Sequence, residues 1–353
     1  ANDNTAVGTF ALGNNSTGTS NVGVGCSALN ANTTSSNNTA VGYHALPVNT
    51  TGSAGVAIGA YALRVNTTGV NNTAVGYAAL YDNTTGQENV AIGKDTLANN
   101  TTANRNTAIG YSVLTTNSTG ADNTGVGHGA LYDNTTGSNN IAVGFNALAN
   151  NTTASQNIAI GSEAMYTNST GVQNVAIGYQ ASYLHTSNSS TAIGFKALKN
   201  QGAIQGNTAV GSGAGLETTT GHNNTFIGDA TGNQNTTGHH NTYIGQTCGY
   251  NNTTGTTNTI VGALAFKQST GGSSNAGFGY DSISNVTGDN NCGYGVNSGN
   301  QITSGSNNTC LGANAGTSTS PSGSITTGSN NVVLGNNSVA NLYCADTSIS
   351  SSD

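Results

Sequence analysis

Three histidines in the C-terminal half have a type and spacing that could bind a metal ion. His222 and His239 are seventeen residues apart, and His240 directly follows the second of them. Imidazole nitrogens are common ligands of zinc, nickel and iron. No carboxylate or cysteine completes the set, so we favour a solvated polar turn and predict no metal or cofactor. The equivalent position in other repeats carries Ser53, Val70 or Gln87.

Catalysis by acidic residues would require two carboxylates, or a nucleophile and a base, within reach of one substrate. Asp82 and Asp133 are the candidates; each follows a tyrosine in a turn, and neither has an evident partner in the sequence. The glycine-rich strings lack the strand, loop and helix order of a phosphate-binding motif. We therefore predict no catalytic and no cofactor-binding residue, and a polysaccharide-cleaving enzyme would need acidic pairs that are not evident here.

Asn-x-Thr sequons recur in one turn of the repeat and are candidate sites for N-linked glycans. The same residues are typical of a tight turn whether or not a glycan is attached, because Asn and Gly tolerate positive φ. Both interpretations stay open on the sequence alone. The asparagines are Asn49, Asn66, Asn83, Asn134, Asn235 and Asn252.

Aromatic residues recur at another fixed position. An exposed row of rings would suit stacking on sugars, whereas rings at a corner of the fold would pack on one another, and we favour packing. The residues are Tyr43, Tyr77, Tyr111, Phe145, Tyr179 and Phe195.

Five cysteines in 353 residues do not form a disulfide framework. Cys292 lies three residues before its anchor position, Gly295, and Cys310 two residues before the next one, Gly312, in neighbouring strands. Because side chains alternate along a strand, these two should point to opposite faces. We predict small hydrophobic side chains rather than a disulfide, and an exposed Cys344.

The elements that position these residues follow from a period of seventeen. The string N-T-A-V-G stands at Asn4–Gly8, Asn38–Gly42 and Asn72–Gly76, and related strings mark twenty repeats. We call the last residue of each string the anchor glycine. Two of the intervals between successive anchor glycines are sixteen residues long instead of seventeen, and an insertion surrounds Pro321. The anchor glycines are Gly8, Gly25, Gly42, Gly59, Gly76, Gly93, Gly110, Gly127, Gly144, Gly161, Gly178, Gly194, Gly211, Gly228, Gly245, Gly262, Gly279, Gly295, Gly312 and Gly335.

Composition excludes several classes of protein. Only 5% of the residues are charged, Trp is absent, Gly supplies 51 positions, and the formal net charge is -7. An acidic chain without a basic cluster is a poor binder of nucleic acid. We also expect no membrane insertion, because no apolar run approaches the roughly 18 residues that a spanning helix needs, and the first residues do not resemble a secretory signal.

Each repeat predicts two short strands and two turns. Residues before the anchor glycine read as a β-strand of Thr, Val or Ile around a central Ala. A second apolar pair follows three and four residues later, as at Ala45 and Leu46, and precedes the turn Asn49–Gly52. Nothing repeats at 3.6 residues, so a helix is excluded. The fold class is all-β, a parallel β-roll or solenoid of about twenty coils, with a length of about 95 Å at the usual strand spacing.

Comparison of the repeats with one another predicts the packing. An Asn stands four residues before the anchor glycine in eighteen of twenty repeats, which predicts an Asn ladder that belongs to the scaffold. Most early coils pair Ala with Leu, whereas Phe226 goes with Gly232 and Tyr243 with Gly249. Because large and small residues trade places, the two positions should share the interior of the coil.

The opposite face of the first strand is apolar too. A thin coil can bury only one face, so the other face should be covered by another copy of the chain. We therefore predict a homo-oligomer, and specifically a homotrimer. The seam would contain the series Val7, Val24, Val41, Ile58, Val75 and Ile92.

The strings N-T-A-V-G and N-V-A-I-G, followed by Y-x-A-L and N-T-T-G, resemble the YadA-like head repeat of trimeric autotransporter adhesins and the related repeats of bacteriophage tail fibres. The likeness covers nearly the whole chain, although adhesin heads usually carry a shorter repeat. It implies a left-handed β-roll, a homotrimer, and a role in display and attachment. The implied partners are a host-surface glycan or protein receptor and other fibre or virion proteins.

The C-terminal repeats differ from the earlier ones. After Leu198 the Ala-Leu pair gives way to pairs that end in Gly. We predict Ala-Leu coils over 1–198, glycine-type coils over 199–316, and an insertion, last coil and tail over 317–353. Asn331–Gly335 and Asp346–Asp353 look like the sequence that leads into the self-cleaving chaperone of phage tail fibres, a junction that would fall at Ser350–Asp353; a frayed end is the alternative.

These observations favour the shaft or collar of a phage or viral tail fibre, on a virion appendage or another extracellular surface. The alternative is a microbial surface adhesin head or a self-assembling extracellular fibril. Continuation of the gene into a coiled-coil stalk and membrane anchor would distinguish the adhesin.

Overall fold

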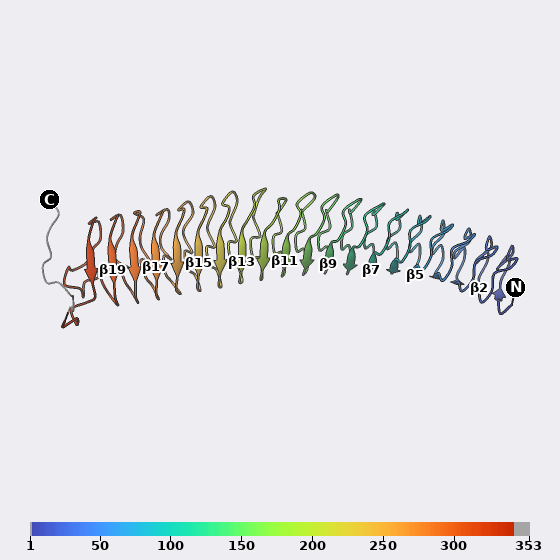
Figure 1. Ribbon diagram of the computed structural model, residues 1–353, viewed down its shortest axis with the longest axis horizontal. Coiled ribbons are helices and arrows are strands. Elements are labelled where there is room, and N and C mark those ends of the chain that lie inside the picture. Colours follow the sequence, from blue (N-terminus) through green and yellow to red (C-terminus); the bar gives the residue numbers. More distant parts are fainter. Residues whose placement is uncertain (1, 342–353) are drawn as a thin grey trace. The chain divides into compact units, whose positions relative to one another are not determined.

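The computed structural model describes residues 2–341, and in this part of the chain each repeat forms one coil of an all-β parallel solenoid (Figure 1). The chain divides into two compact units, unit 1 (Ala1–Thr220) and unit 2 (Gly221–Asp353). The predicted fold class is confirmed. The change in composition after Leu198 lies inside unit 1, and Cys344 and Asp346–Asp353 lie outside the described residues.

Each coil contributes one three-residue strand, immediately before its anchor glycine. In unit 1 these are β1 (Thr5–Val7), β2 (Val22–Val24), β3 (Thr39–Val41), β4 (Val56–Ile58), β5 (Thr73–Val75), β6 (Val90–Ile92), β7 (Thr107–Ile109), β8 (Thr124–Val126), β9 (Ile141–Val143), β10 (Ile158–Ile160), β11 (Val175–Ile177), β12 (Thr191–Ile193) and β13 (Thr208–Val210). In unit 2 they are β14 (Thr225–Ile227), β15 (Thr242–Ile244), β16 (Thr259–Val261), β17 (Ala276–Phe278), β18 (Cys292–Tyr294), β19 (Thr309–Leu311) and β20 (Val332–Leu334).

Within each unit every strand pairs in parallel with the next strand along the chain, and equivalent repeat positions face one another. Thr39 pairs with Val56, for example, one full period later. Val175 pairs with Thr191 across a step of sixteen, so the shorter repeat keeps the register. The insertion around Pro321 is accommodated in the same way, because Thr309 pairs with Val332.

The prediction of a second strand in each coil is wrong. His44 and Leu46 have φ of 50° and 49°, in the left-handed region, so the apolar pair lies in a run of turns. The His44 N–H donates to the Cys26 carbonyl of the preceding coil and the Leu46 N–H to the Ala62 carbonyl of the following coil, each at 3.0 Å. Alternate left-handed residues prevent an extended strand, yet the backbone still links coils on both sides.

The interior of a coil is filled from the two positions that the sequence comparison singled out. Ala57 and Leu63 are fully buried in a coil of unit 1. In unit 2, Phe226 is fully buried, and a Cβ at Gly232 would lie 2.5 Å from its Cε1. The predicted exchange of large and small residues across a shared interior is therefore confirmed.

The Asn ladder is confirmed as scaffold. The Asn38 N–H donates to Asn21 Oδ1 at 3.0 Å, and Asn38 Nδ2 donates to the Gly52 carbonyl at 3.0 Å. Asn38 Oδ1 in turn accepts the Gly55 N–H of the next coil at 2.8 Å. Each such side chain satisfies buried backbone groups along the solenoid axis.

The anchor glycine is required by close approach of neighbouring coils. Gly76 has a φ of 135°, which side-chain-bearing residues rarely adopt. A Cβ there would also lie 2.5 Å from the Gly93 carbonyl oxygen. Stacking of the coils and left-handed geometry together explain why this residue recurs at every step.

Candidate functional site

The outer face of the strands carries a row of aliphatic side chains that a single chain leaves partly exposed. The residue before the anchor glycine is 40% exposed at Ile58 and 38% exposed at both Ile92 and Ile109. The neighbouring Ala57 is fully buried, so the strand alternates as predicted. We call this set the outer aliphatic row. In unit 1 it comprises Val7, Val24, Val41, Ile58, Val75, Ile92, Ile109, Val126, Val143, Ile160, Ile177, Ile193 and Val210.

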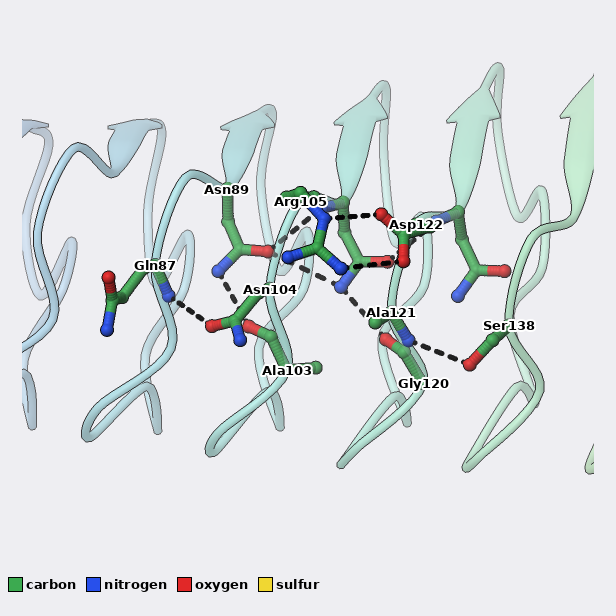
Figure 2. A network of polar contacts seen from close by, with 11 residues as sticks. Gln87, Asn89, Ala103, Asn104, Arg105, Gly120, Ala121, Asp122 and Ser138 are labelled. Carbon is green, nitrogen blue, oxygen red and sulfur yellow. Dashed lines mark hydrogen bonds and ion pairs between the residues drawn. The ribbon is translucent and has the colours of Figure 1, made fainter.

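A second feature is a polar corner formed by positions eleven and twelve after the anchor glycine (Figure 2). There the Arg105 guanidinium donates from Nε to Asp122 Oδ1 at 2.6 Å and from Nη2 to Oδ2 at 2.9 Å, as Figure 2 shows. The hydrogen bond from Arg105 holds the pKa of the Asp122 carboxyl below its usual value. Side chains seventeen residues apart therefore reach one another at this corner.

The three candidate histidines occupy the same corner in unit 2, and the structure brings them together. All three offer a ring nitrogen, and these atoms lie within 4.8 Å of one another. The His222 and His239 rings stack with centroids 4.8 Å apart, and His239 Nδ1 lies 2.9 Å from His240 Nδ1. Partial burial, together with the nearby His222 and His240, lowers the pKa of His239. The surroundings of His239 therefore favour its neutral form.

The aromatic row lies half exposed, but its rings pack on their neighbours. Lys94 Nζ is 5.9 Å from the Tyr77 ring centroid and 5.6 Å from that of Tyr111. The His128 ring stacks between Tyr111 and Phe145, with centroids 5.1 Å and 5.3 Å away. These contacts support packing of the rings on their neighbours.

A surface hollow that the sequence analysis missed lies near the N-terminal end of unit 1. Its volume is about 540 Å³, and the Arg64 guanidinium beside it is 5.5 Å from the Tyr61 ring centroid and 5.1 Å from that of Tyr81. Pro47, one of 2 prolines in the chain, was the available signal. The lining residues are Ser27, Asn30, Ala31, His44, Pro47, Val48, Arg64 and Val65.

The sequon asparagines form a second, interior ladder, which supports the tight turn of the two interpretations left open by the sequence. Asn49 and Asn66 are 0% and 2% exposed. Asn66 Nδ2 donates to Asn49 Oδ1 at 3.0 Å and to the Gly69 carbonyl at 3.1 Å, so both amide hydrogens are used. The folded coil leaves no room for a glycan at these positions. The other candidates, Asn83, Asn134, Asn235 and Asn252, are buried as well.

His185 takes the place of asparagine in this interior ladder. Its Nε2 lies 2.9 Å from Asn174 Oδ1, and the side chain is buried. Burial lowers the pKa of His185 from 6.5 to about 4. The imidazole is therefore neutral in the folded coil at physiological pH.

We expect the free energy of unfolding of a His185→Asn variant to depend less on acid pH than that of the native chain. The unfolded chain binds a proton near pH 6.5 and the folded chain only near pH 4, so the free energy of unfolding falls as the pH drops between these values and levels off below. The shift corresponds to about 3 kcal/mol. Urea unfolding of both proteins near neutral pH and at about pH 4 measures the difference. An equal acid-induced loss in both proteins would contradict the assignment.

The remaining reactive side chains form no site within the described residues. Cys26, Cys248, Cys292 and Cys310 are free thiols, which agrees with the predicted absence of a disulfide there. Burial raises the pKa of Cys248, and it raises the pKa of Cys310 to about 11. These two thiols are protonated interior groups.

The two candidate carboxylates do not form a pair within one chain. Asp82 and Asp133 occupy the same repeat position three periods apart. At the usual strand spacing, three periods correspond to about 14 Å. That separation is too large for the two groups to act on one bond.

No protein-family model matches the chain, and a search of curated proteins finds no significant relative. Among the residues that the structure describes, no helix has the length and apolar character needed to cross a membrane. The outer aliphatic row, the polar corner and the surface hollow are therefore interpreted from their own geometry.

Proposed function

We propose that the chain is a structural attachment protein, the shaft or collar of a phage or viral tail fibre, and that it acts as a homotrimer. The observation that supports this most directly is the outer aliphatic row. Its members recur in successive coils at the same position, and residues such as Ile58 and Ile160 remain partly exposed in the single chain. Two further copies of the chain would cover this strip and complete the burial that one thin coil cannot provide.

Stiffness along each unit supports a load-bearing role. Backbone pairing and two asparagine ladders bond each coil to its neighbours, as at Asn38 and Asn66. Side chains outside these ladders vary from coil to coil, so the scaffold can display different surfaces without change to its core. A host glycan or protein receptor would bind on such exposed turns, for example at the hollow beside Arg64. Neighbouring fibre proteins are the other proposed partners.

The repeat strings support this proposal through their resemblance to YadA-like heads and phage tail-fibre repeats. From this resemblance we propose that the protein is located on a virion appendage or another extracellular surface. No residue is proposed as a catalyst, because rigidity and display need none.

The mass of the particle in solution tests the proposal. A chain of 34.9 kDa should give a particle three times as heavy by light scattering after gel filtration, about 105 kDa. Negative-stain images should show narrow, elongated particles. A monomeric globule would overturn the proposal, and particles joined end to end into filaments would favour a self-assembling fibril instead.

A further inference from the structure

The histidine cluster of unit 2 has the composition of a transition-metal site. Three imidazoles with one open position form a known ligand set for zinc, at Zn–N distances of about 2.0–2.1 Å. Ligands at the corners of such a tetrahedron lie about 3.4 Å apart. The ring nitrogens of His222, His239 and His240 lie within 4.8 Å of one another, and the closest pair is 2.9 Å apart. Rotation of the rings about χ2, which is a soft torsion, would be needed to bring three nitrogens to this spacing.

We propose that His222, His239 and His240 bind one divalent transition-metal ion of the zinc class per chain. Water completes the coordination at the exposed side of the cluster, since His240 is exposed and the other two rings are half-buried. The ion joins two neighbouring coils, because His222 belongs to one coil and the His239–His240 pair to the next. This inference is separate from the proposed attachment function, which needs no ion.

The backbone holds the three ligands in place before an ion arrives. The His240 N–H donates to the His222 carbonyl at 3.0 Å, and the Thr257 N–H donates to the His239 carbonyl at 3.0 Å. His240 has a φ of 57°, the left-handed conformation of this corner position. At the equivalent corner of unit 1, the Arg105–Asp122 pair shows that side chains one period apart come into contact. Preorganised ligands lose little entropy on binding.

Asn223 supplies a partner for the second nitrogen of a ligand ring. Its Nδ2 lies 3.2 Å from His240 Nε2. When His240 binds the ion through Nδ1, Nε2 carries the hydrogen, and a rotated Asn223 amide accepts it through Oδ1. Such outer contacts orient ligating imidazoles in metal sites.

The experiment titrates the metal-stripped full chain with Zn²⁺ by calorimetry and with Co²⁺ by visible absorption. We expect one ion per chain and the intense d–d bands of four-coordinate Co²⁺. His239→Gln and His240→Gln should each weaken Zn²⁺ binding by more than tenfold, and Asn223→Ala by roughly tenfold. Far-UV circular dichroism and the melting temperature without metal show whether each variant is folded.

His128→Gln is the matched control. His128 is also exposed and lies between two aromatic rings of the row, but no second histidine shares its position. Its loss should leave the affinity and the Co²⁺ spectrum unchanged, and Zn²⁺ should raise the melting temperature of this variant but not of His239→Gln. The proposal is overturned if the native chain binds less than one ion per chain, if folded His239→Gln and His240→Gln variants bind as tightly as the native chain, or if His128→Gln weakens binding equally.

Discussion

An Ile92→Asp/Ile109→Asp variant should be a monomer at micromolar concentration, whereas the native chain should be a trimer. Each isoleucine of the outer aliphatic row contributes about 2 kcal/mol of apolar burial when a neighbouring chain covers it. Aspartates in the same place would put several carboxylates into an apolar seam, and an unpaired buried charge costs several kcal/mol more. In the separate chain both positions are already 38% exposed, so the coil itself tolerates the change.

Leu184→Asp is the control for this variant. Leu184 is 43% exposed, also lies in unit 1, and belongs to a turn rather than to the outer aliphatic row. Light scattering should find the mass of the Leu184→Asp protein unchanged from the native one. If the double aspartate variant keeps the native mass, the row is not the seam. If both variants dissociate, the effect does not depend on the row.

Much of the fold could be predicted from the repeat, because the same structural requirement acts at the same position of many coils within one chain. The close approach of coils at Gly76 recurs at nearly every anchor glycine, and the backbone groups satisfied by Asn38 recur at nearly every repeat. The exchange between Phe226 and Gly232 was visible for the same reason, since the other coils supply the Ala-Leu comparison. Comparison of the repeats with one another thus predicted which positions share the interior of a coil.

Backbone conformation was the part that the repeat could not predict. Leucine is disfavoured in the left-handed region, so Leu46 reads as a strand residue by local preference. In the structure its N–H bonds to the Ala62 carbonyl of the next coil, and that contact compensates for the strained φ. A contact of this kind exists only in the stack, and no single repeat contains it.

The geometry of the candidate sites also depends on contacts between coils that a single repeat does not contain. Asn49 reads as an exposed turn residue, yet stacking places it in the interior, where Asn66 of the next coil donates to its Oδ1. The spacing of His222 and His239 places them at the same position of successive coils, where their rings stack. The convergence of His240 with them could not be read from the spacing, because it depends on the left-handed turn at position twelve.

A double exchange in the interior of unit 2 should restore most of the stability that either single change removes. Phe226→Ala alone should cost about 3–5 kcal/mol, because the ring is fully buried and its loss leaves a cavity. Gly232→Leu alone should cost at least about 1–3 kcal/mol, since even a Cβ would lie 2.5 Å from the Phe226 ring. Together they recreate the Ala-Leu pairing seen at Ala57 and Leu63.

The backbone is suited to the larger residue. Gly232 has a φ of 56° and Leu63 one of 50°, so leucine adopts the required conformation elsewhere in this chain. We expect the double variant to lie within about 2 kcal/mol of the native protein, which gives a coupling energy of about 2 kcal/mol or more. Urea unfolding of the four proteins measures it. Additive losses would mean that residues 226 and 232 do not share one interior space, because only direct competition for volume makes one substitution compensate the other.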